Sequence, residues 1–546
     1  MNPTHTSTRG WLLRVFFLAL IIGILGSLWQ WYQHVTVEVK AEGGSVHEGI
    51  IGAPRFINPV LAQSQADQDL TRLVFTPLVS IDRTGSVRYL LAESLETSPD
   101  GLSYTLTLKD DLSFEDGEAL TANDVVFTVK AIQDSLIKSP LNARWQGVEV
   151  NKVDQRTVIF NLARPFNDFP YNLEIGILPE HIWGEVEPEA FVFNTYNTNP
   201  VGSGPYHVSS IDVADTGVPK KYTLTRSSSS VEAPYLKHVT LNFFENEAAL
   251  TEALEDGSID AAYGLAPGSI LDIDQDRIHS ATLPRVFALF FNLGAEKSVL
   301  GSSKIRQAIS LAINKDILVK DTFGDFAYPI NSAFGFTDEA SWFDPGKAIN
   351  MIESDGWKRN EDGWYSKSDK DGETILAFSI AVPNLEEVRA VAQHIEEDLA
   401  AVGIKVTVRS YDQGNFNQNI LRPRDYEAII FGYEIEKPTD IYAFWHSSQV
   451  SDPGLNISLF KDANVDSLLS GLRTSRDPDL DTIDDAITSR YPAVFLYAPS
   501  YVYVLPKRVR GTSFSIARSS DRFDRISEWY VATRHVWSWF VDEDEA

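Results

Sequence analysis

The chain has 546 residues, of which 43% are hydrophobic and 11% aromatic, so it can bury more than one packed core. Its 47 basic and 76 acidic residues give a formal charge of −29, which repels nucleic acid phosphates, so we expect no nucleic acid partner. The absence of cysteine excludes disulfides, thiolate catalysis, cysteine zinc sites and a lipid anchor on an N-terminal cysteine.

Residues 11–32 predict a transmembrane helix. The run WLLRVFFLALIIGILGSLWQWY holds one charged residue, Arg14, and is long enough to cross a bilayer. Tryptophan and tyrosine at its far end are typical of a membrane interface, and the basic residues before it place residues 1–10 in the cytoplasm. A cleaved signal peptide is the alternative, but no A-x-A-like site follows. We expect an uncleaved single-pass anchor, with most of the chain outside the cell membrane.

A strand, a turn and a helix follow one another between residues 102 and 132. The alternating leucine and tyrosine of LSYTLTL predict a half-buried strand, and Asp116-Gly117 predicts a tight turn. Thr121 followed by Asp124 predicts the start of a helix, because these side chains can cap each other's backbone N–H groups.

The run NPVGSGPY at residues 199–206 contains two glycines and two prolines, which fix a backbone path rather than perform chemistry. A phosphate-binding loop is excluded because no Lys-Ser or Lys-Thr follows and no helix is predicted there.

The second half of the chain alternates helices and strands. The run FALFFN at 287–292 predicts a strand that is buried on both faces. The helix predicted over 386–402 leads directly into a strand at 404–408, and further buried strands are predicted at 425–433 and 491–504. This alternation predicts a mostly parallel sheet that is covered by helices.

Four stretches carry a resemblance to a known family: FEDGEALTANDVVFTV, NPVGSGPY, RQAISLAINK and YAFWHSSQ. They resemble the family-5 solute-binding proteins of ABC importers, the oligopeptide- and dipeptide-binding group. The matching signatures run from about Ser45 to Val509. The resemblance implies an α/β, two-lobed periplasmic-binding-protein-like fold (type II, large), with an additional small inserted lobe, after the one N-terminal transmembrane helix.

The resemblance also implies boundaries for these parts. The expected segments are a linker over 33–44, lobe I over 45–78, 196–286 and 498–546, the inserted lobe II over 79–195, and lobe III over 287–497.

Several ligand-binding residues are implied by the same resemblance. The loop Ser64, Gln65 and Ala66 is where relatives pair their backbone with a ligand. The strand ending at Gly432 and Tyr433 also reaches the ligand in relatives.

Four positions after Gly432, oligopeptide binders carry an aspartate that holds the α-ammonium group of the peptide. Here that position is Glu436, and Asp440 is a rival for the same role.

Five aromatic side chains are further candidates for ligand contact. They are Trp145, Trp445, His446, Tyr501 and Tyr503. Trp445 offers a stacking face and His446 a titratable edge. The alternative for Trp445 and Trp145 is core packing, and the alternative for His446 is a side chain that is hydrogen-bonded to the backbone.

The function that the resemblance implies is a membrane-anchored, monomeric receptor that binds extended peptides and delivers them to ABC permease subunits. Main-chain pairing would give affinity that is independent of peptide sequence. The chain has no G-x-x-x-x-G-K-[ST] motif, so we expect separate ATPase subunits, and we predict no cofactor, no metal and no catalytic residue.

Two alternatives remain open: a tethered peptide sensor or chaperone on the same fold, and an extracytoplasmic hydrolase. The chain lacks G-x-S-x-G and H-E-x-x-H, although paired carboxylates would serve a hydrolase as well. The ligand also stays open, because relatives of this family take nickel chelates, sugars or opines as well as peptides.

Overall fold

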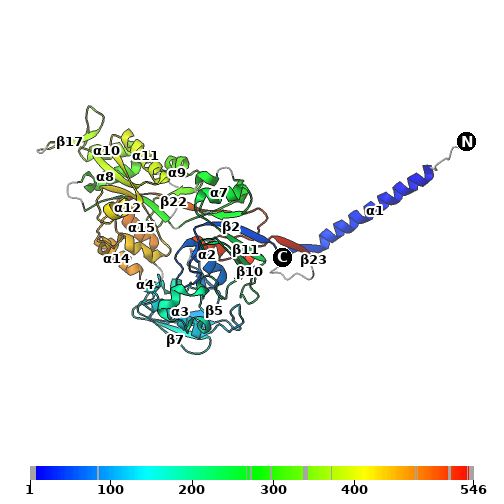
Figure 1. Cartoon of the computed structure of the whole chain (residues 1–546). Helices are drawn as coiled ribbons and strands as arrows, with labels where there is room; N and C mark the ends of the chain where they lie inside the picture. The colour runs from blue at the N-terminus through cyan, green and yellow to red at the C-terminus, as the bar shows by residue number, and fades with distance from the viewer. Residues whose placement is uncertain are drawn as a thin grey trace.

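The structure is a computed structural model, and it describes residues 8–82, 85–265, 267–270, 273–283, 285–294, 298–335, 342–369, 372–473, 475, 478–514, 518–537 and 539. Helix α1 (Thr8–Val35) extends away from the rest of the chain (Figure 1). Its segment Arg14–Tyr32 has 19 residues and a mean hydropathy of 1.8, and none of it is buried in the protein. By length and composition, this helix can cross a membrane.

Strand β1 (Thr36–Ala41) follows α1 without an intervening loop and pairs antiparallel with strand β23 (Ala532–Trp537) near the C-terminus. Thr36 lies opposite Trp537, whose ring is 5.5 Å from that of Trp31 at the end of α1. The expected linker at 33–44 therefore contains the end of a helix and a paired strand.

The largest sheet has twelve strands, in the order β20-β19-β21-β14-β22-β12-β2-β11-β10-β9, with β13 and β15 also paired to β22. Their bounds are β2 (Ser45–Ile51), β9 (Tyr206–Val213), β10 (Pro219–Arg226), β11 (His238–Phe244), β12 (Ala261–Tyr263), β13 (Ile278–Thr282), β14 (Arg285–Phe291), β15 (Ala327–Pro329), β19 (Ala377–Pro383), β20 (Lys405–Tyr411), β21 (Ala428–Glu434) and β22 (Ala493–Val504).

This sheet is mixed, so the prediction of a mostly parallel sheet is wrong. Helix α11 (Glu386–Ala401) connects β19 to β20, and these two strands are parallel, as a helical crossover requires. Strand β14, however, pairs antiparallel with both β21 and β22. The alternation of helix and strand predicts the local parallel crossover. It does not predict whether strands from distant parts of the chain pair parallel or antiparallel.

Strand β22 belongs to both halves of the sheet. Its first part pairs with β14, where Val494 lies opposite Leu289, and its last part pairs with β13, where Val504 lies opposite Ile278. This one strand of 12 residues therefore links the part of the chain around β14 to the part around β2.

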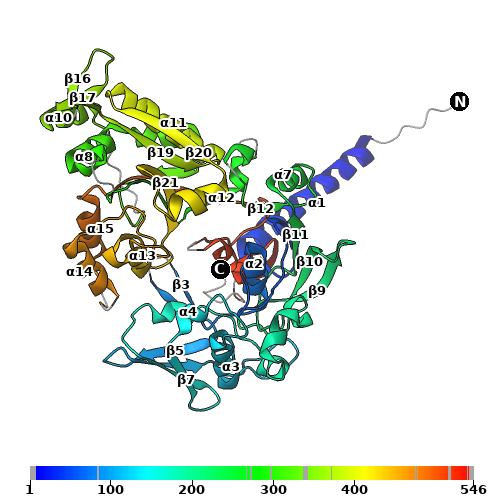
Figure 2. The ribbon, with the colours of Figure 1, turned by 60° about the vertical axis from the view of Figure 1, so that its left-hand side comes forward.

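A second sheet is smaller and antiparallel, in the order β5-β6-β8-β7. Its strands are β5 (Ala92–Thr97), β6 (Ser103–Leu108), β7 (Val148–Lys152) and β8 (Thr157–Leu162), and helix α3 (Ala122–Gln133) packs against it (Figure 2). The predicted cap is confirmed: Thr121 accepts a hydrogen bond from the Asn123 N–H group, and Asp124 accepts one from the Thr121 N–H group at 2.8 Å.

The remaining longer helices are α2 (Gln65–Val74), α7 (Glu247–Glu255), α8 (Ser303–Ala312), α9 (Lys315–Phe323), α10 (Pro345–Ser354), α14 (Ala463–Leu472) and α15 (Leu480–Thr488). Short helices α4 (Asn142–Trp145) and α13 (Ile441–Trp445) complete the parts that matter for the site.

The hydrophobic cores show which parts pack together. One cluster runs from the small sheet, through Leu106 and Phe160, into β2 and β11, through Val46 and Leu241. Strand β14 is covered on both faces, as predicted: Leu289 belongs to one cluster and Phe290 to another. The division of the chain into lobes with the expected boundaries stays a prediction.

The glycines of the run at 199–206 allow a close approach to the end of α2. A Cβ atom added at Gly202 would lie 2.0 Å from the Val74 carbonyl oxygen, and one at Gly204 would lie 2.4 Å from the Val74 carbonyl carbon. The Gly204 N–H group donates to that oxygen at 2.7 Å. The expected structural role of these glycines is thereby confirmed.

Candidate functional site

The central pocket lies where six segments of the chain meet, and it has a volume of about 440 Å³. One wall is helix α2, and the others come from residues 141–144, from 174–176, from Leu283 and Arg285, from 434–436 at the end of strand β21, and from 518–521 near the C-terminus. The charged residues in its lining are Arg72, Arg144, Glu174, Arg285, Glu434, Glu436, Arg518 and Asp521.

Opposite charges are paired around this pocket. Arg144 lies 3.4 Å from Glu436, and Arg285 is hydrogen-bonded to Glu434. The first pair joins residues that are 292 positions apart, so it connects the region of the small sheet to the segment after β21. The pocket therefore presents both signs of charge to whatever enters it.

Arg518 is held by two carboxylates of the pocket lining. It donates to Glu174 at 3.0 Å and to Asp521 at 3.3 Å. Burial alone would lower the pKa of Arg518, but the attraction of Asp521 and Glu174 outweighs burial and raises the pKa. Burial raises the pKa of Glu174, and the nearby Arg518 charge opposes that rise.

A buried ionic triad lies behind this wall. Arg522 donates to Glu48 at 2.6 and 2.9 Å and to Asp69 at 2.6 and 2.8 Å, and all three side chains are 0% exposed. Burial raises the pKa of Glu48, whereas Arg522 opposes the rise. Gln65, which lines the pocket, donates to Asp69 at 2.6 Å, so the triad fixes part of the pocket wall.

A second pocket, the basic pocket, has a volume of about 820 Å³ and lies between the region of the small sheet and the segment 437–473. In Figure 2, helices α13 and α14 of that segment lie near α4. Arg144 lines both pockets, so they adjoin. Thr439 is hydrogen-bonded to Asp168, which makes a further contact between the two sides.

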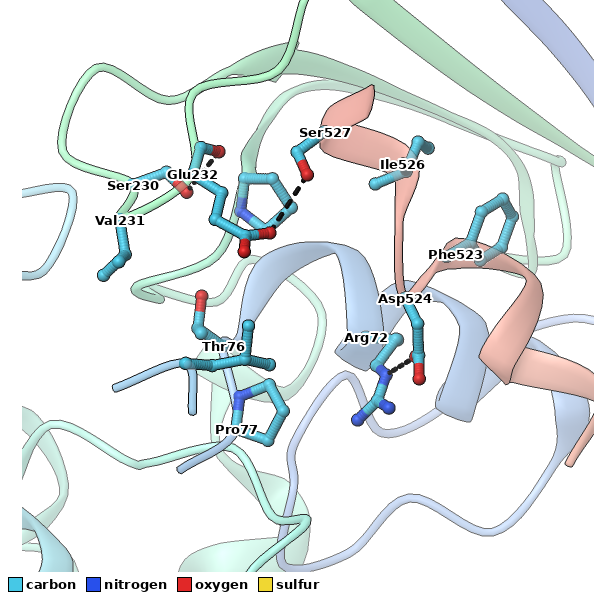
Figure 3. Close-up of a pocket in the computed structure, with 12 residues that line it drawn as sticks. Arg72, Thr76, Pro77, Ser230, Val231, Glu232, Phe523, Asp524, Ile526 and Ser527 are labelled. Atoms are coloured by element: carbon cyan, nitrogen blue, oxygen red, sulfur yellow. Dashed lines mark hydrogen bonds and ion pairs between the residues drawn. The ribbon is translucent and has the colours of Figure 1, made fainter. Parts of the chain in front are cut away.

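Figure 3 shows a third pocket, with a volume of about 40 Å³, between the end of α2, residues 230–232 and residues 523–527. Around it, Glu232 accepts a hydrogen bond from Ser527 at 3.0 Å, and Arg72 is paired with Asp524. This volume is large enough for a few water molecules but too small for a peptide. We interpret it as a structural joint between α2 and the C-terminal segment.

The predicted loop at the start of α2 lies partly in the central pocket. Gln65 lines the pocket. Ser64 is the N-cap of α2, where its hydroxyl accepts a hydrogen bond from the Asp67 N–H group at 3.1 Å. Ala66 is 1% exposed, so its side chain is part of the core.

The two candidates for an ammonium partner are in different settings. Glu436 lines the central pocket and pairs with Arg144. Asp440 accepts a hydrogen bond from the Lys437 N–H group at 3.1 Å, and burial raises the pKa of its carboxyl, against the attraction of Lys437. Asp440 therefore already serves to hold the turn at 437–440.

Gly432 and Tyr433 lie within strand β21 rather than after it. A Cβ atom at Gly432 would lie 2.7 Å from the Phe287 ring, so the glycine makes room for that ring. The Tyr433 hydroxyl donates to the Ala333 carbonyl oxygen at 2.6 Å, and the side chain is buried. Neither residue lines the central or the basic pocket.

The predicted aromatic contacts are packed in the cores. Trp145 contacts Phe160 and Phe169, and Trp445 stacks on Phe290 with ring centres 5.7 Å apart. Both tryptophans are buried and line neither the central nor the basic pocket, and ligand contact by either one stays a prediction.

Tyr501, Tyr503 and His446 also contact other side chains of the protein. The Tyr503 hydroxyl donates to Glu48 at 2.5 Å, and the Tyr501 ring stacks on Tyr263 at 4.8 Å. His446 lies against the Tyr442 ring at 4.2 Å, and its Nδ1 is 2.8 Å from the Ser448 hydroxyl. None of the three lines the central or the basic pocket.

The sequence did not single out the arginines that line the two pockets, which are Arg72, Arg144, Arg285 and Arg518 in the central pocket and Arg144, Arg164 and Arg473 in the basic pocket. Arg144 lies next to Trp145, the residue that was chosen in its place. The available signal was a charged residue beside a large aromatic residue in an irregular segment, because arginine is mostly exposed and Arg144 lines the pocket from an exposed position.

Comparisons with known proteins find relatives by sequence and by fold. The family model described as bacterial extracellular solute-binding proteins, family 5 Middle, matches residues 86–453. The oligopeptide-binding protein AppA of Bacillus subtilis (strain 168) is 26% identical over 513 residues, which cover 90% of this chain and 92% of AppA.

Two solved structures are similar over most of the chain. The crystal structure of the ABC transporter substrate binding protein CtaP from Listeria monocytogenes has a TM-score of 0.75 at 25% identity and covers 90% of this chain and 99% of CtaP. The structure of AppA from Bacillus subtilis in complex with a nonapeptide has a TM-score of 0.64 at 24% identity and covers 90% of this chain and 100% of that chain. Since the family model spans more than half of the sequence, the chain belongs to family 5 of the bacterial extracellular solute-binding proteins.

Proposed function

We propose that this protein is a membrane-anchored receptor that binds peptides in the central pocket and delivers them to the permease of an ABC importer. The observation that carries the proposal is a pocket lined by paired charges of both signs, contributed by six segments of the chain. A free peptide carries an ammonium group at one end and a carboxylate at the other, so both of its ends find partners in such a pocket.

Family membership supports the same assignment. The relative AppA is named for oligopeptide binding, and its structure contains a nonapeptide. The family and these relatives are binding proteins, which is why we propose a receptor rather than an enzyme.

The mechanism that we propose is closure of two lobes about the pocket. The Arg144–Glu436 pair and the contact between Asp168 and Thr439 connect opposite sides, and strand β22 connects the two halves of the large sheet. A ligand that bridges the two sides adds contacts that exist only in the closed state, so it shifts the population toward closure. The permease would recognise that closed shape.

Helix α1 is the proposed anchor. It runs directly into strand β1, and β1 is paired with β23, so the anchor continues into the folded part without a flexible connection. We propose that residues 1–10 face the cytoplasm and that the folded part lies outside, where the substrate is captured.

Native mass spectrometry of the full chain in lipid nanodiscs tests this proposal. After incubation with an equimolar mixture of di- to decapeptides, we expect one peptide per protein molecule, with no peptide fragments that arise from cleavage. Failure of every peptide to bind would contradict the receptor function, and the appearance of cleaved products would favour the hydrolase.

A further inference from the structure

The basic pocket is lined by positive charges, although the chain as a whole is acidic. Its lining includes Arg144, Arg164, Lys437 and Arg473, and no aspartate or glutamate is among its described lining residues. The chain as a whole has 76 acidic and 47 basic residues. A wall of four cations without a carboxylate is therefore a local reversal of the overall charge.

Most of these cations are not neutralised by ion pairs. Arg144 pairs with Glu436 at 3.4 Å. Within the part of the chain that the structure describes, Arg164 and Arg473 form no ion pair. The Arg473 guanidinium lies 5.0 Å from the centre of the Tyr442 ring, which leaves its N–H groups available at the edge.

Lys437 contributes a third positive charge. Its Nζ lies 5.1 Å from the centre of the Phe166 ring. Burial lowers the pKa of Lys437, whereas the negative charges of Asp440 and Asp168 act in the opposite direction. An anion that enters the pocket would strengthen the charged form of this lysine as well.

The number of cations indicates more than one anionic group on the ligand. A peptide without acidic side chains has one carboxylate, at its C-terminus, whereas four cations line the basic pocket and two of them, Arg164 and Arg473, form no ion pair within the described residues. Unpaired guanidinium groups bind carboxylates through two parallel hydrogen bonds, an arrangement that lysine or neutral side chains do not reproduce. The volume of about 820 Å³ leaves room for several side chains.

We propose that the basic pocket binds acidic side chains of the ligand, so that the receptor selects peptides rich in aspartate and glutamate. This inference rests on the proposed peptide-binding function and names the substrate class of the same cleft. An acidic peptide is attracted by the positive pocket but carries the same sign of charge as the protein as a whole. The attraction in the pocket must therefore outweigh the long-range repulsion by the rest of the protein.

The test compares two pentapeptides that differ only in charge, AEAEA and AQAQA, by isothermal titration calorimetry on the full chain in nanodiscs. We expect AEAEA to bind at least about tenfold more tightly at low salt, with the difference shrinking as salt rises. In the double variant Arg164→Gln, Arg473→Gln, the preference should disappear while the affinity for AQAQA is retained. Arg409→Gln, at an exposed position of strand β20, is the matched control and should keep the preference.

The outcomes separate this inference from the proposed function. Equal affinity of the two peptides would overturn the acidic preference while peptide binding itself stands. Binding of neither peptide, nor of any peptide in the mixture, would overturn both. If C-terminal amidation of AEAEA abolishes its binding while AQAQA with a free C-terminus binds as tightly as AEAEA, the pocket binds the terminal carboxylate, and the inference is also overturned.

Discussion

Replacement of Arg522 by methionine should destabilise the protein far more than the same replacement of a surface arginine. Arg522 makes four hydrogen bonds of 2.6–2.9 Å to Glu48 and Asp69, and all three side chains are 0% exposed. Methionine fills most of the volume but leaves two carboxylates buried without a cation. Loss of one partner from a buried pair costs about 3–5 kcal/mol.

The matched control is Arg525→Met, three residues along the chain. Arg525 pairs with Glu528, and their side chains are 46% and 39% exposed, so this loss should cost at most about 1 kcal/mol. The assay is urea unfolding of the full chain in detergent, followed by tryptophan fluorescence.

The Arg522→Met loss should also depend on pH. Without Arg522, the carboxylates of Glu48 and Asp69 bind protons more tightly in the folded than in the unfolded state. The variant should therefore lose more unfolding free energy at pH 8 than at pH 5. Equal unfolding midpoints for Arg522→Met and Arg525→Met, or a loss that does not change with pH, would refute this account of the triad.

Three further predictions concern other parts of the chain. Burial raises the pKa of Glu115 from 4.5 to about 7, so the folded state holds this proton more tightly, and Glu115 destabilises the protein as pH rises through that range, by up to roughly 3 kcal/mol. Glu115→Gln should therefore raise the melting temperature at pH 8 and leave it unchanged at pH 4. Gly202→Ala should cost at least about 1–3 kcal/mol in urea unfolding, because the added Cβ would lie 2.0 Å from the Val74 carbonyl oxygen. Glu436→Gln should weaken the binding of peptides with a free N-terminus about tenfold in calorimetry, whereas Asp440→Asn should not.

Each of these predictions has a control and a contradicting result. An equal increase in melting temperature for Glu115→Gln at pH 4 and pH 8 would exclude titration of Glu115 as the cause of the increase. Gly301→Ala, where the added Cβ meets no atom within 4 Å, should be neutral, and an equal loss at both glycines would contradict the steric argument. Wild-type protein that binds N-acetylated and free peptides equally well would contradict the ammonium role of Glu436.

Local features could be predicted from the sequence because a few neighbouring residues determine them. The cap formed by Thr121 and Asp124 depends on a spacing of three residues, and the structure confirms it. The close approach at Gly202 was likewise readable as a need for glycine, although its partner, Val74, was not.

The site was harder to predict because its walls come from distant segments. Tyr503 and Trp445 lie in motifs that resemble the family, yet the hydroxyl of Tyr503 is bound to Glu48, which lies 455 positions away. The arginines of the pockets look like ordinary surface charges in the sequence. Only the tertiary arrangement shows that Arg144 faces Glu436.

The most direct test of the central claim is a reversible lock between the two sides of the cleft. Asp168 and Thr439 are hydrogen-bonded side chain to side chain, and the chain has no cysteine, so the double variant Asp168→Cys, Thr439→Cys introduces the only two thiols. The lock is a disulfide or a short bismaleimide, and each single variant is a control.

The rate of exchange of a fluorescent peptide is measured before and after locking. The account predicts that a peptide bound beforehand is trapped, that a peptide added afterwards is excluded, and that reduction of the disulfide restores exchange. Equal exchange rates in the locked and unlocked protein would contradict the claim that the ligand is held between these two sides.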